Sequence, residues 1–124
     1  KNESLEGFFI NPTVISGIDH SYEIAREEVF GPVLSIIEWT DIDEMLSEVN
    51  GLNVGLTASI WTQDISMAMK LSKRISAGYV WINDSSDHYL GAPFGGVKDS
   101  GLGREECLEE MYSYTNAKTV TIVT

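Results

Sequence analysis

The single cysteine, Cys107, is the one thiol in this chain that could serve as a nucleophile. A catalytic thiol needs a neighbouring base or a positive charge to form the thiolate. Four acidic residues flank it instead: Glu105, Glu106, Glu109 and Glu110. Because Cys107 also shares an apolar stripe with Leu108 and Met111, we expect a buried, unreactive side chain. No catalytic residue is therefore predicted in this chain.

A pair of adjacent acids stands before an aromatic residue and a turn, in the run Glu27-Glu28-Val29-Phe30-Gly31-Pro32. A carboxylate can accept hydrogen bonds from two hydroxyls of a ribose, and a phenyl ring can pack on a flat heterocycle. These residue types allow Glu28 and Phe30 to contact a nucleotide. By themselves they are a weak signal, and a solvated helix end is the default interpretation.

Five glycines and Pro93 make residues 83–103 a long polar loop, and loops of this length in compact domains are usually functional. Phosphate binding is one interpretation, but the templates fail. Gly91 and Gly96 have the P-loop spacing without the Lys-Ser or Lys-Thr that should follow, and a dinucleotide turn starting at Gly101 would need glycine where Glu106 stands. The alternative is that the glycines let the backbone turn tightly around Phe94.

The two histidines, His20 and His88, have no ligand-type spacing to Cys, Asp or Glu, so no metal site is predicted. His88 lies in the long loop. It either lines the mouth of a pocket or is an exposed loop histidine.

Alternating strand-like and helix-like patterns must position these residues. Strands are predicted at residues 8–15, 33–39, 56–61, 79–82 and 119–123, and helices at residues 21–27, 42–49, 65–75 and 104–111. The apolar run 33–39 is typical of a strand covered on both faces. Short connections between these elements imply βαβ crossovers, so the predicted fold is α/β with a largely parallel sheet. The long loop follows a strand at its carboxyl end, where ligands bind in such sheets.

Two of the helices carry clear end signals. Thr40 and Asp43 resemble a capping box, and Asn50-Gly51 supplies a stop. Thr62 or Asp64 can cap the next helix. The apolar faces are predicted from i, i+3, i+4 spacing: Ile42, Met45, Leu46 and Val49 in the first helix, and Ile65, Ala68, Leu71 and Ile75 in the second.

Composition limits the possible partners. The chain has 124 residues, 43% of them hydrophobic, and a formal charge of −11, which argues against nucleic acid. No apolar run approaches the ~20 residues of a membrane helix. One cysteine rules out an intrachain disulfide and is compatible with a reducing compartment, so we expect a cytoplasmic protein. The chain opens on Lys1 rather than Met, with a polar lead-in over residues 1–7, which suggests a piece of a longer polypeptide.

Five blocks, in this order, resemble consecutive blocks of the aldehyde dehydrogenase superfamily. They are Glu27-Glu28-Val29-Phe30-Gly31-Pro32, Asn53-Val54-Gly55-Leu56-Thr57-Ala58-Ser59-Ile60-Trp61-Thr62, Gly78-Tyr79-Val80-Trp81-Ile82-Asn83, Pro93-Phe94-Gly95-Gly96-Val97-Lys98-Asp99-Ser100-Gly101-Leu102-Gly103-Arg104-Glu105 and Tyr114-Thr115-Asn116-Ala117-Lys118-Thr119-Val120. The order and spacing resemble that family from about Gly7 to the end of the chain.

The resemblance implies roles for particular residues. Glu28 is expected to bind the nicotinamide ribose hydroxyls of NAD or NADP, and Phe30 to pack near the nicotinamide ring. The substrate tunnel for an aldehyde is expected to include His88, Tyr89 and Phe94. The final strand, Lys118 to Val123, is expected to pair with a neighbouring subunit of a homodimer or homotetramer.

The family's nucleophilic cysteine, general base, oxyanion-hole asparagine and dinucleotide turn all precede the region that resembles this chain. Cys107 corresponds to none of them, so the isolated chain is predicted to be inactive. His88 stands where the family often has an aromatic residue, which leaves the substrate open.

The resulting hypothesis is a C-terminal piece of an aldehyde dehydrogenase, with residues 1–117 in the catalytic domain and residues 118–124 as the oligomerisation strand. The alternative is a free-standing truncated domain that acts only in assembly. A third, weaker hypothesis is a relative acting on acyl phosphates or semialdehydes.

Overall fold

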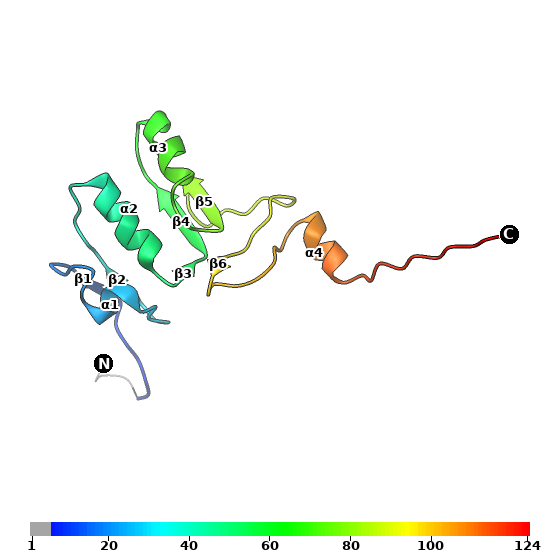
Figure 1. Ribbon diagram of the computed structural model, residues 1–124. Helices are drawn as coiled ribbons and strands as arrows, with labels where there is room; N and C mark the ends of the chain where they lie inside the picture. Colours follow the sequence, from blue (N-terminus) through cyan, green and yellow to red (C-terminus); the bar gives the residue numbers. More distant parts are fainter. Residues whose placement is uncertain (1–5) are drawn as a thin grey trace. The chain divides into compact units, whose positions relative to one another are not determined.

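A computed structural model describes residues 6–124 of the chain (Figure 1). Most of the predicted polar lead-in, residues 1–7, therefore lies outside the described residues. The chain divides into two compact units, Lys1–Glu48 and Val49–Thr124.

The first unit contains one strand–helix–strand motif, made of β1 (Thr13–Ile15), α1 (Glu23–Arg26) and β2 (Val33–Ser35). The two strands are parallel, with Thr13 opposite Val33 and Ile15 opposite Ser35. The Ser35 hydroxyl donates to the carbonyl of Ile24 at 3.2 Å and so ties the helix to the second strand. Both strands are shorter than predicted. The prediction that residues 33–39 are covered on both faces is wrong for this structure, since Leu34 is 58% exposed.

The predicted helix over residues 42–49 is confirmed as α2 (Ile42–Gly51), which buries Leu46. Its cap is not the predicted one. The carboxylate Oδ1 of Asp41 accepts the backbone N–H groups of Asp43 and Glu44, each at 2.8 Å. Asp41 directly precedes the first helical residue, which places its carboxylate within reach of the second and third helical N–H groups. Thr40 stands one residue too early for this role.

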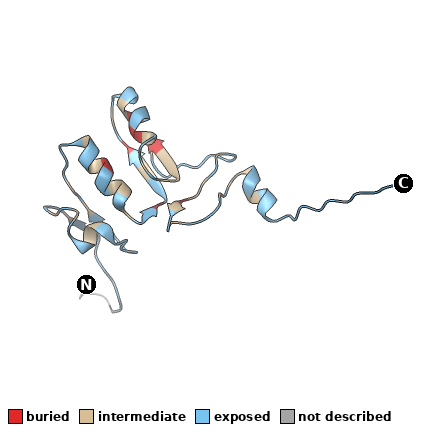
Figure 2. Ribbon diagram, in the orientation of Figure 1, coloured by how far each residue is buried: buried red, intermediate tan, exposed pale blue. Residues whose placement is uncertain are grey.

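The second unit is built around a second strand–helix–strand motif. The parallel strands β4 (Thr57–Ile60) and β5 (Tyr79–Ile82) pair from Thr57 opposite Tyr79 to Ile60 opposite Ile82, and α3 (Ile65–Ser72) connects them. The buried apolar side chains of this unit all belong to these elements (Figure 2): Ile60, Ala68, Leu71 and Trp81. The predicted cap of α3 is confirmed at Asp64, whose carboxylate accepts the N–H of Met67 at 2.9 Å. Ile65, predicted to face inward, is instead 61% exposed.

The glycine-rich segment, residues 83–103, contains regular structure that the sequence did not predict. The short strand β6 (Val97–Lys98) pairs antiparallel with β3 (Val54–Gly55). Phe94 and Glu105 form an isolated antiparallel bridge, with N–O distances of 2.7 and 3.0 Å. The last helix, α4 (Leu108–Ser113), therefore begins later than predicted. The backbone of Glu105 is occupied by the bridge, and Glu106 has φ +59°, a left-handed conformation that no helix contains.

Residues 119–123 form no strand in the described part of the chain, and Val120 and Ile122 are 71% and 80% exposed. A strand needs a neighbour for its hydrogen bonds, so the pairing of this segment with a second subunit stays a prediction. The two parallel pairs, each closed through a helix, confirm the predicted α/β class with βαβ crossovers. No helix within residues 6–124 is long and apolar enough to cross a lipid bilayer.

Candidate functional site

In the first unit, Glu28 and Phe30 lie on the loop between α1 and β2. The helix ends at Glu27, whose backbone N–H still donates to the carbonyl of Glu23 at 2.9 Å. Two tight turns follow, with Gly31 donating to Val29 at 2.6 Å and Val33 donating to Gly31 at 2.8 Å. Glu28 is exposed, and the ring of Phe30 is 97% exposed. The loop thus presents the exposed carboxylate of Glu28 and the exposed ring of Phe30, two residues apart.

In the second unit, four rings gather beside β5. Tyr79 and Trp81 come from the strand, and His88 and Phe94 come from the segment that follows it. The ring centroids of His88 and Phe94 are 4.2 Å apart, and those of Tyr79 and Trp81 are 4.8 Å apart. The His88 ring lies 6.0 Å from Trp81 with an angle of only 18° between the ring planes. The structure therefore brings together two of the three predicted tunnel residues.

The third predicted tunnel residue, Tyr89, lies on the rim of an adjacent open pocket. This pocket has a volume of about 360 Å³, and Tyr79 and Trp81 line it together with Tyr89. The Tyr89 side chain is 62% exposed. The four-ring cluster and the pocket thus share β5 as a common wall.

Hydrogen bonds fix the loop that carries these rings. The indole Nε1 of Trp81 donates to the carbonyl of Asp87 at 2.8 Å. Gly91 donates to the carbonyl of Glu106 at 2.8 Å, and the Nδ1 atom of His88 lies 3.1 Å from the carboxylate of Glu106. Both interpretations of His88 hold in part: its ring packs in a cluster beside a pocket, and the residue is exposed, with 33% of its side chain accessible. Glu106 was not predicted as a partner, because its contact with His88 depends on its left-handed backbone.

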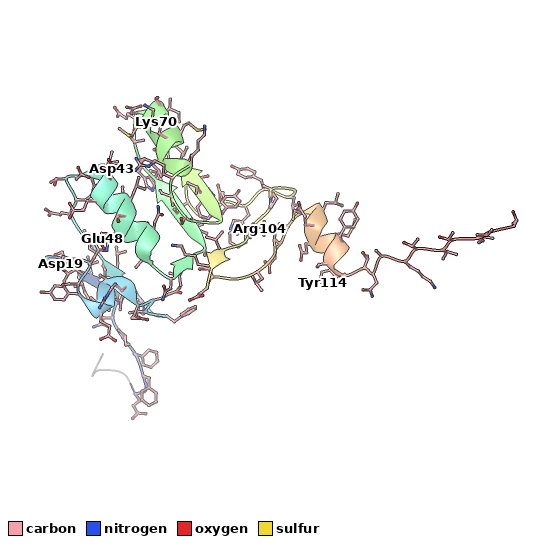
Figure 3. The ribbon with its side chains drawn as sticks, viewed as in Figure 1. Asp19, Asp43, Glu48, Lys70, Arg104 and Tyr114 are labelled. Carbon is pink, nitrogen blue, oxygen red and sulfur yellow. The ribbon has the colours of Figure 1, made fainter. Side chains whose placement is uncertain are left out.

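The glycines of this segment are explained by close packing of backbone on backbone. A Cβ on Gly78 would collide with the carbonyl of Gly95, and one on Gly96 would come within 2.5 Å of the Ser100 Cβ. The guanidinium of Arg104, labelled in Figure 3, donates to the carbonyls of Gly96 at 2.9 Å and Gly103 at 2.7 Å. These contacts support the interpretation of tight backbone turns rather than a phosphate cradle.

Two further side chains fasten the same block to the rest of the unit. The Ser100 hydroxyl accepts the N–H of Gly55 at 2.8 Å, and the Lys98 ammonium donates to the carbonyls of Asn50 and Leu52, each at 2.7 Å. Lys98 thus satisfies carbonyls at the C-terminal end of α2, where a cation is favoured by the helix dipole.

Cys107 is half-buried and occupies the cap position before α4. The predicted apolar stripe is wrong, since Leu108 and Met111 are 55% and 59% exposed. A hydrogen bond from the Cys107 thiol, followed by one from the backbone N–H of Glu109 itself, lowers the pKa of the Glu109 carboxyl. The thiol is thus a hydrogen-bond donor to a carboxylate, and the described contacts place no histidine or cation beside it.

The first unit also holds an acidic pocket of about 430 Å³ that the sequence did not predict. His20 lines it, with Nδ1 at 3.9 Å from the carboxylate of Glu48. Hydrogen bonds from the Ser21 side chain and backbone lower the pKa of Asp19 on its rim. Within residues 6–124, no group of three or more Cys, His, Asp or Glu residues is arranged to hold a metal ion.

The sequence was compared with known proteins. A model of the Aldehyde dehydrogenase family matches residues 1–120. The chain is 47% identical over 116 residues to Aldehyde dehydrogenase tropH of Talaromyces stipitatus, covering 94% of this chain and 22% of that protein. It is 44% identical over 117 residues to Retinaldehyde dehydrogenase 3 of Homo sapiens, covering 94% of this chain and 23% of that protein.

Solved structures agree with these matches. An NAD+ complex of aldehyde dehydrogenase from Bacillus cereus superposes with a TM-score of 0.87 at 37% identity, covering 94% of this chain and 24% of that one. The chain thus spans less than a quarter of the length of these relatives. The glycine-rich block, the βαβ motifs and these matches lead to one conclusion: the chain belongs to the aldehyde dehydrogenase family.

Proposed function

We propose that this chain is the C-terminal part of an NAD(P)-dependent aldehyde dehydrogenase that oxidises an aldehyde to a carboxylic acid. The observation that supports this most directly is the likeness to the Bacillus cereus enzyme in complex with NAD+, which extends over 94% of the chain. Glu28 and Phe30, whose exposed side chains are free to contact a ligand, fit the cofactor role that the resemblance implies.

In this proposal, the Glu28 carboxylate accepts hydrogen bonds from the hydroxyls of the nicotinamide ribose, and the Phe30 ring packs against the nicotinamide. The cofactor supplies the hydride acceptor. The two residues hold the ring in a reactive orientation and take part in no bond that forms or breaks. Their contribution is therefore to positioning.

The aldehyde would enter beside His88, Tyr89 and Phe94, which line the tunnel in this proposal. The nucleophile, the general base and the turn that holds the cofactor pyrophosphate would come from other residues of a longer polypeptide. Cys107, whose thiol hydrogen-bonds to the Glu109 carboxylate and has acidic rather than basic neighbours, lacks the positive environment that a nucleophilic thiolate needs. We therefore expect the 124-residue chain alone to oxidise no aldehyde with either cofactor.

The test is single-turnover kinetics of the complete dehydrogenase carrying Glu28→Gln. The substitution keeps the shape of the side chain but removes the negative charge and one of the two oxygens that accept hydrogen bonds from the ribose hydroxyls. We expect hydride transfer to slow by about tenfold or more, the equivalent of one charge-assisted hydrogen bond, with a smaller change in cofactor affinity.

Glu27→Gln is the matched control, since it removes the neighbouring acid at the end of α1 and should leave hydride transfer unchanged. An unchanged hydride rate in Glu28→Gln would refute the ribose role. Acid production by the isolated chain that depends on Cys107 would refute the placement of the nucleophile elsewhere.

A further inference from the structure

His88 and Glu106 form a pair that sets the chemistry of one wall of the proposed tunnel. The His88 Nδ1 and the Glu106 carboxylate oxygen are 3.1 Å apart, and each side chain is about one-third exposed. Such a contact is a hydrogen bond to a charged acceptor, which is stronger than one between neutral groups. It is the one hydrogen bond that the described residues give to the His88 ring.

Glu106 is held rigidly for this task. Its backbone N–H donates to the carboxylate of Glu110 at 2.7 Å, and its carbonyl accepts the N–H of Gly91 at 2.8 Å. Its φ of +59° is a conformation that non-glycine residues rarely adopt, so the surrounding contacts must hold it there. These contacts fix the backbone position from which the Glu106 side chain reaches His88.

A carboxylate at Nδ1 decides which nitrogen of a neutral imidazole carries the proton. A carboxylate only accepts, so it favours the tautomer with the proton on Nδ1 and leaves Nε2 with a free lone pair. The ring of His88 then offers a ring-nitrogen acceptor among the aromatic side chains of the cluster. A phenylalanine or tryptophan at this position would offer none.

The surroundings define what that acceptor can recognise. The Phe94 ring is tilted against His88 with a centroid distance of 4.2 Å, and Trp81 lies nearly parallel to His88 at 6.0 Å. Trp81 also lines the adjoining pocket of about 360 Å³, which has the size of small-molecule sites. Flat aromatic rings fit such a lining, and a ring hydroxyl is a donor that matches Nε2.

We infer that Glu106 holds His88 as the tautomer whose Nε2 accepts a hydrogen bond, and that His88 thereby selects aromatic aldehydes that carry a ring hydroxyl. The inference rests on the proposed function, because it takes His88 as a residue of the aldehyde tunnel. In these terms His88 is a specificity residue and Glu106 a positioning residue.

The experiment measures kcat/KM of the complete dehydrogenase for para-hydroxybenzaldehyde and para-methylbenzaldehyde, which are similar in size but differ in the donor. The preference is the kcat/KM for the hydroxyl compound divided by that for the methyl compound. We expect this ratio to be about tenfold higher in the wild-type protein than in His88→Phe, the effect of one hydrogen bond. Glu106→Gln should lose most of that preference, because an amide can pair with either tautomer. Glu105→Gln, the same change of charge one residue away, should keep it.

Two further measurements separate this role from a structural one. Nitrogen-15 NMR of histidine-labelled protein, assigned with His88→Phe, should show Nδ1 protonated in the wild type and a mixture of tautomers in Glu106→Gln. His88→Gln keeps an acceptor near the position of Nε2 and should retain part of the preference for the hydroxyl compound. This variant serves as the test if His88→Phe folds poorly.

Three outcomes would overturn the inference. If the ratio of kcat/KM for the two aldehydes is the same in the wild type and in His88→Phe, the inference is refuted and the proposed function stands. A clear preference for para-carboxybenzaldehyde would show a charged His88 and refute the acceptor role. A complete protein that oxidises no aldehyde refutes the proposed function and this inference together.

Discussion

Gly78 lies so close to the backbone of Gly95 and Gly96 that a single methyl group cannot be accommodated. The colliding atoms are backbone atoms, which cannot rotate away as a side chain could. We therefore expect Gly78→Ala to destabilise the complete protein by at least about 2 kcal/mol, measured by urea unfolding.

Gly51→Ala is the control for this substitution. Gly51 ends α2, has no positive φ, and a Cβ there would meet nothing within 4 Å. Alanine should be neutral or should stabilise by about 0.5 kcal/mol, because it restricts the unfolded chain. Equal effects at the two positions would show that the contact of Gly78 with Gly95 is absent in solution.

The hydrogen bond between Cys107 and Glu109 predicts a specific pH dependence. The folded pKa of Glu109 is lowered from its ordinary value of 4.5, chiefly by the Cys107 thiol. This carboxylate therefore contributes stability above its unfolded pKa, and that contribution is lost as the pH falls through the lowered folded pKa. We expect Cys107→Ala to raise the pKa of Glu109 toward 4.5, as measured by carboxyl NMR titration. Cys107→Ser, which keeps a donor, should leave the pKa of Glu109 lowered. If the pKa of Glu109 stays equally low in both variants, the backbone N–H of Glu109 alone causes the shift.

Helix ends were the elements most nearly predictable from sequence, and the reasons differ from one to the next. Asp64 was predicted as one of two possible caps and is the cap of α3. The predicted cap of α2, Thr40, lies one residue before the observed cap. Thr40 and Asp43 have the spacing of a capping box, but Asp41 is the residue that directly precedes the helix and accepts its N–H groups. Position matters more than residue type when Thr and Asp stand side by side.

Elements held by distant contacts were not predictable in the same way. The strand β6 forms because Val97 and Lys98 meet Val54 and Gly55, more than forty residues earlier in the chain. No local pattern signals such a pairing. The aromatic cluster shows the same limit. His88 and Phe94 are predicted as tunnel residues from the family resemblance, but the contact of Glu106 with His88 involves a left-handed backbone that no local sequence pattern predicts.

The cap of α3 offers a test at this scale. Asp64→Ala removes the acceptor of the Met67 N–H and should destabilise the protein by about 1 kcal/mol in urea unfolding. Gln63→Ala, one residue earlier and exposed, should cost much less. If the two variants unfold alike, another group caps α3 in solution.

At the scale of the whole molecule, the amount of buried apolar surface is small for the length of the chain. Among residues 6–48 the one buried apolar side chain is Leu46, and the second unit adds four. Many large apolar side chains are exposed instead, among them Phe8, Phe30, Leu90 and Ile122. Surface of this kind normally meets other protein. We expect the 124-residue chain to aggregate unless the rest of a longer polypeptide covers it.

The terminal segment, residues 118–124, is the part for which the resemblance implies a role in assembly. Val120 and Ile122 alternate with threonines, as in a half-buried strand, yet form no strand within the described chain. If this segment pairs with a second subunit, as we propose, deletion of residues 118–124 should shift the complete protein toward smaller species in sedimentation. A truncation ending at residue 122 is the milder comparison. An unchanged sedimentation coefficient after the full deletion would place the interface elsewhere.

The parallel pair of β4 and β5 has a consequence for amide hydrogen exchange. In a parallel ladder, alternate residues direct their N–H groups to the same neighbour. Tyr79 and Asn83 donate to Leu56 and Ile60 of the β4 side, so the N–H groups of Val80 and Ile82 face the other edge, where the described residues place no strand. In the chain by itself these two amides should exchange with deuterium much faster than those of Tyr79 and Asn83. Slow exchange at all four in that experiment would report a further strand, supplied by a second copy of the chain, paired along the free edge of β5.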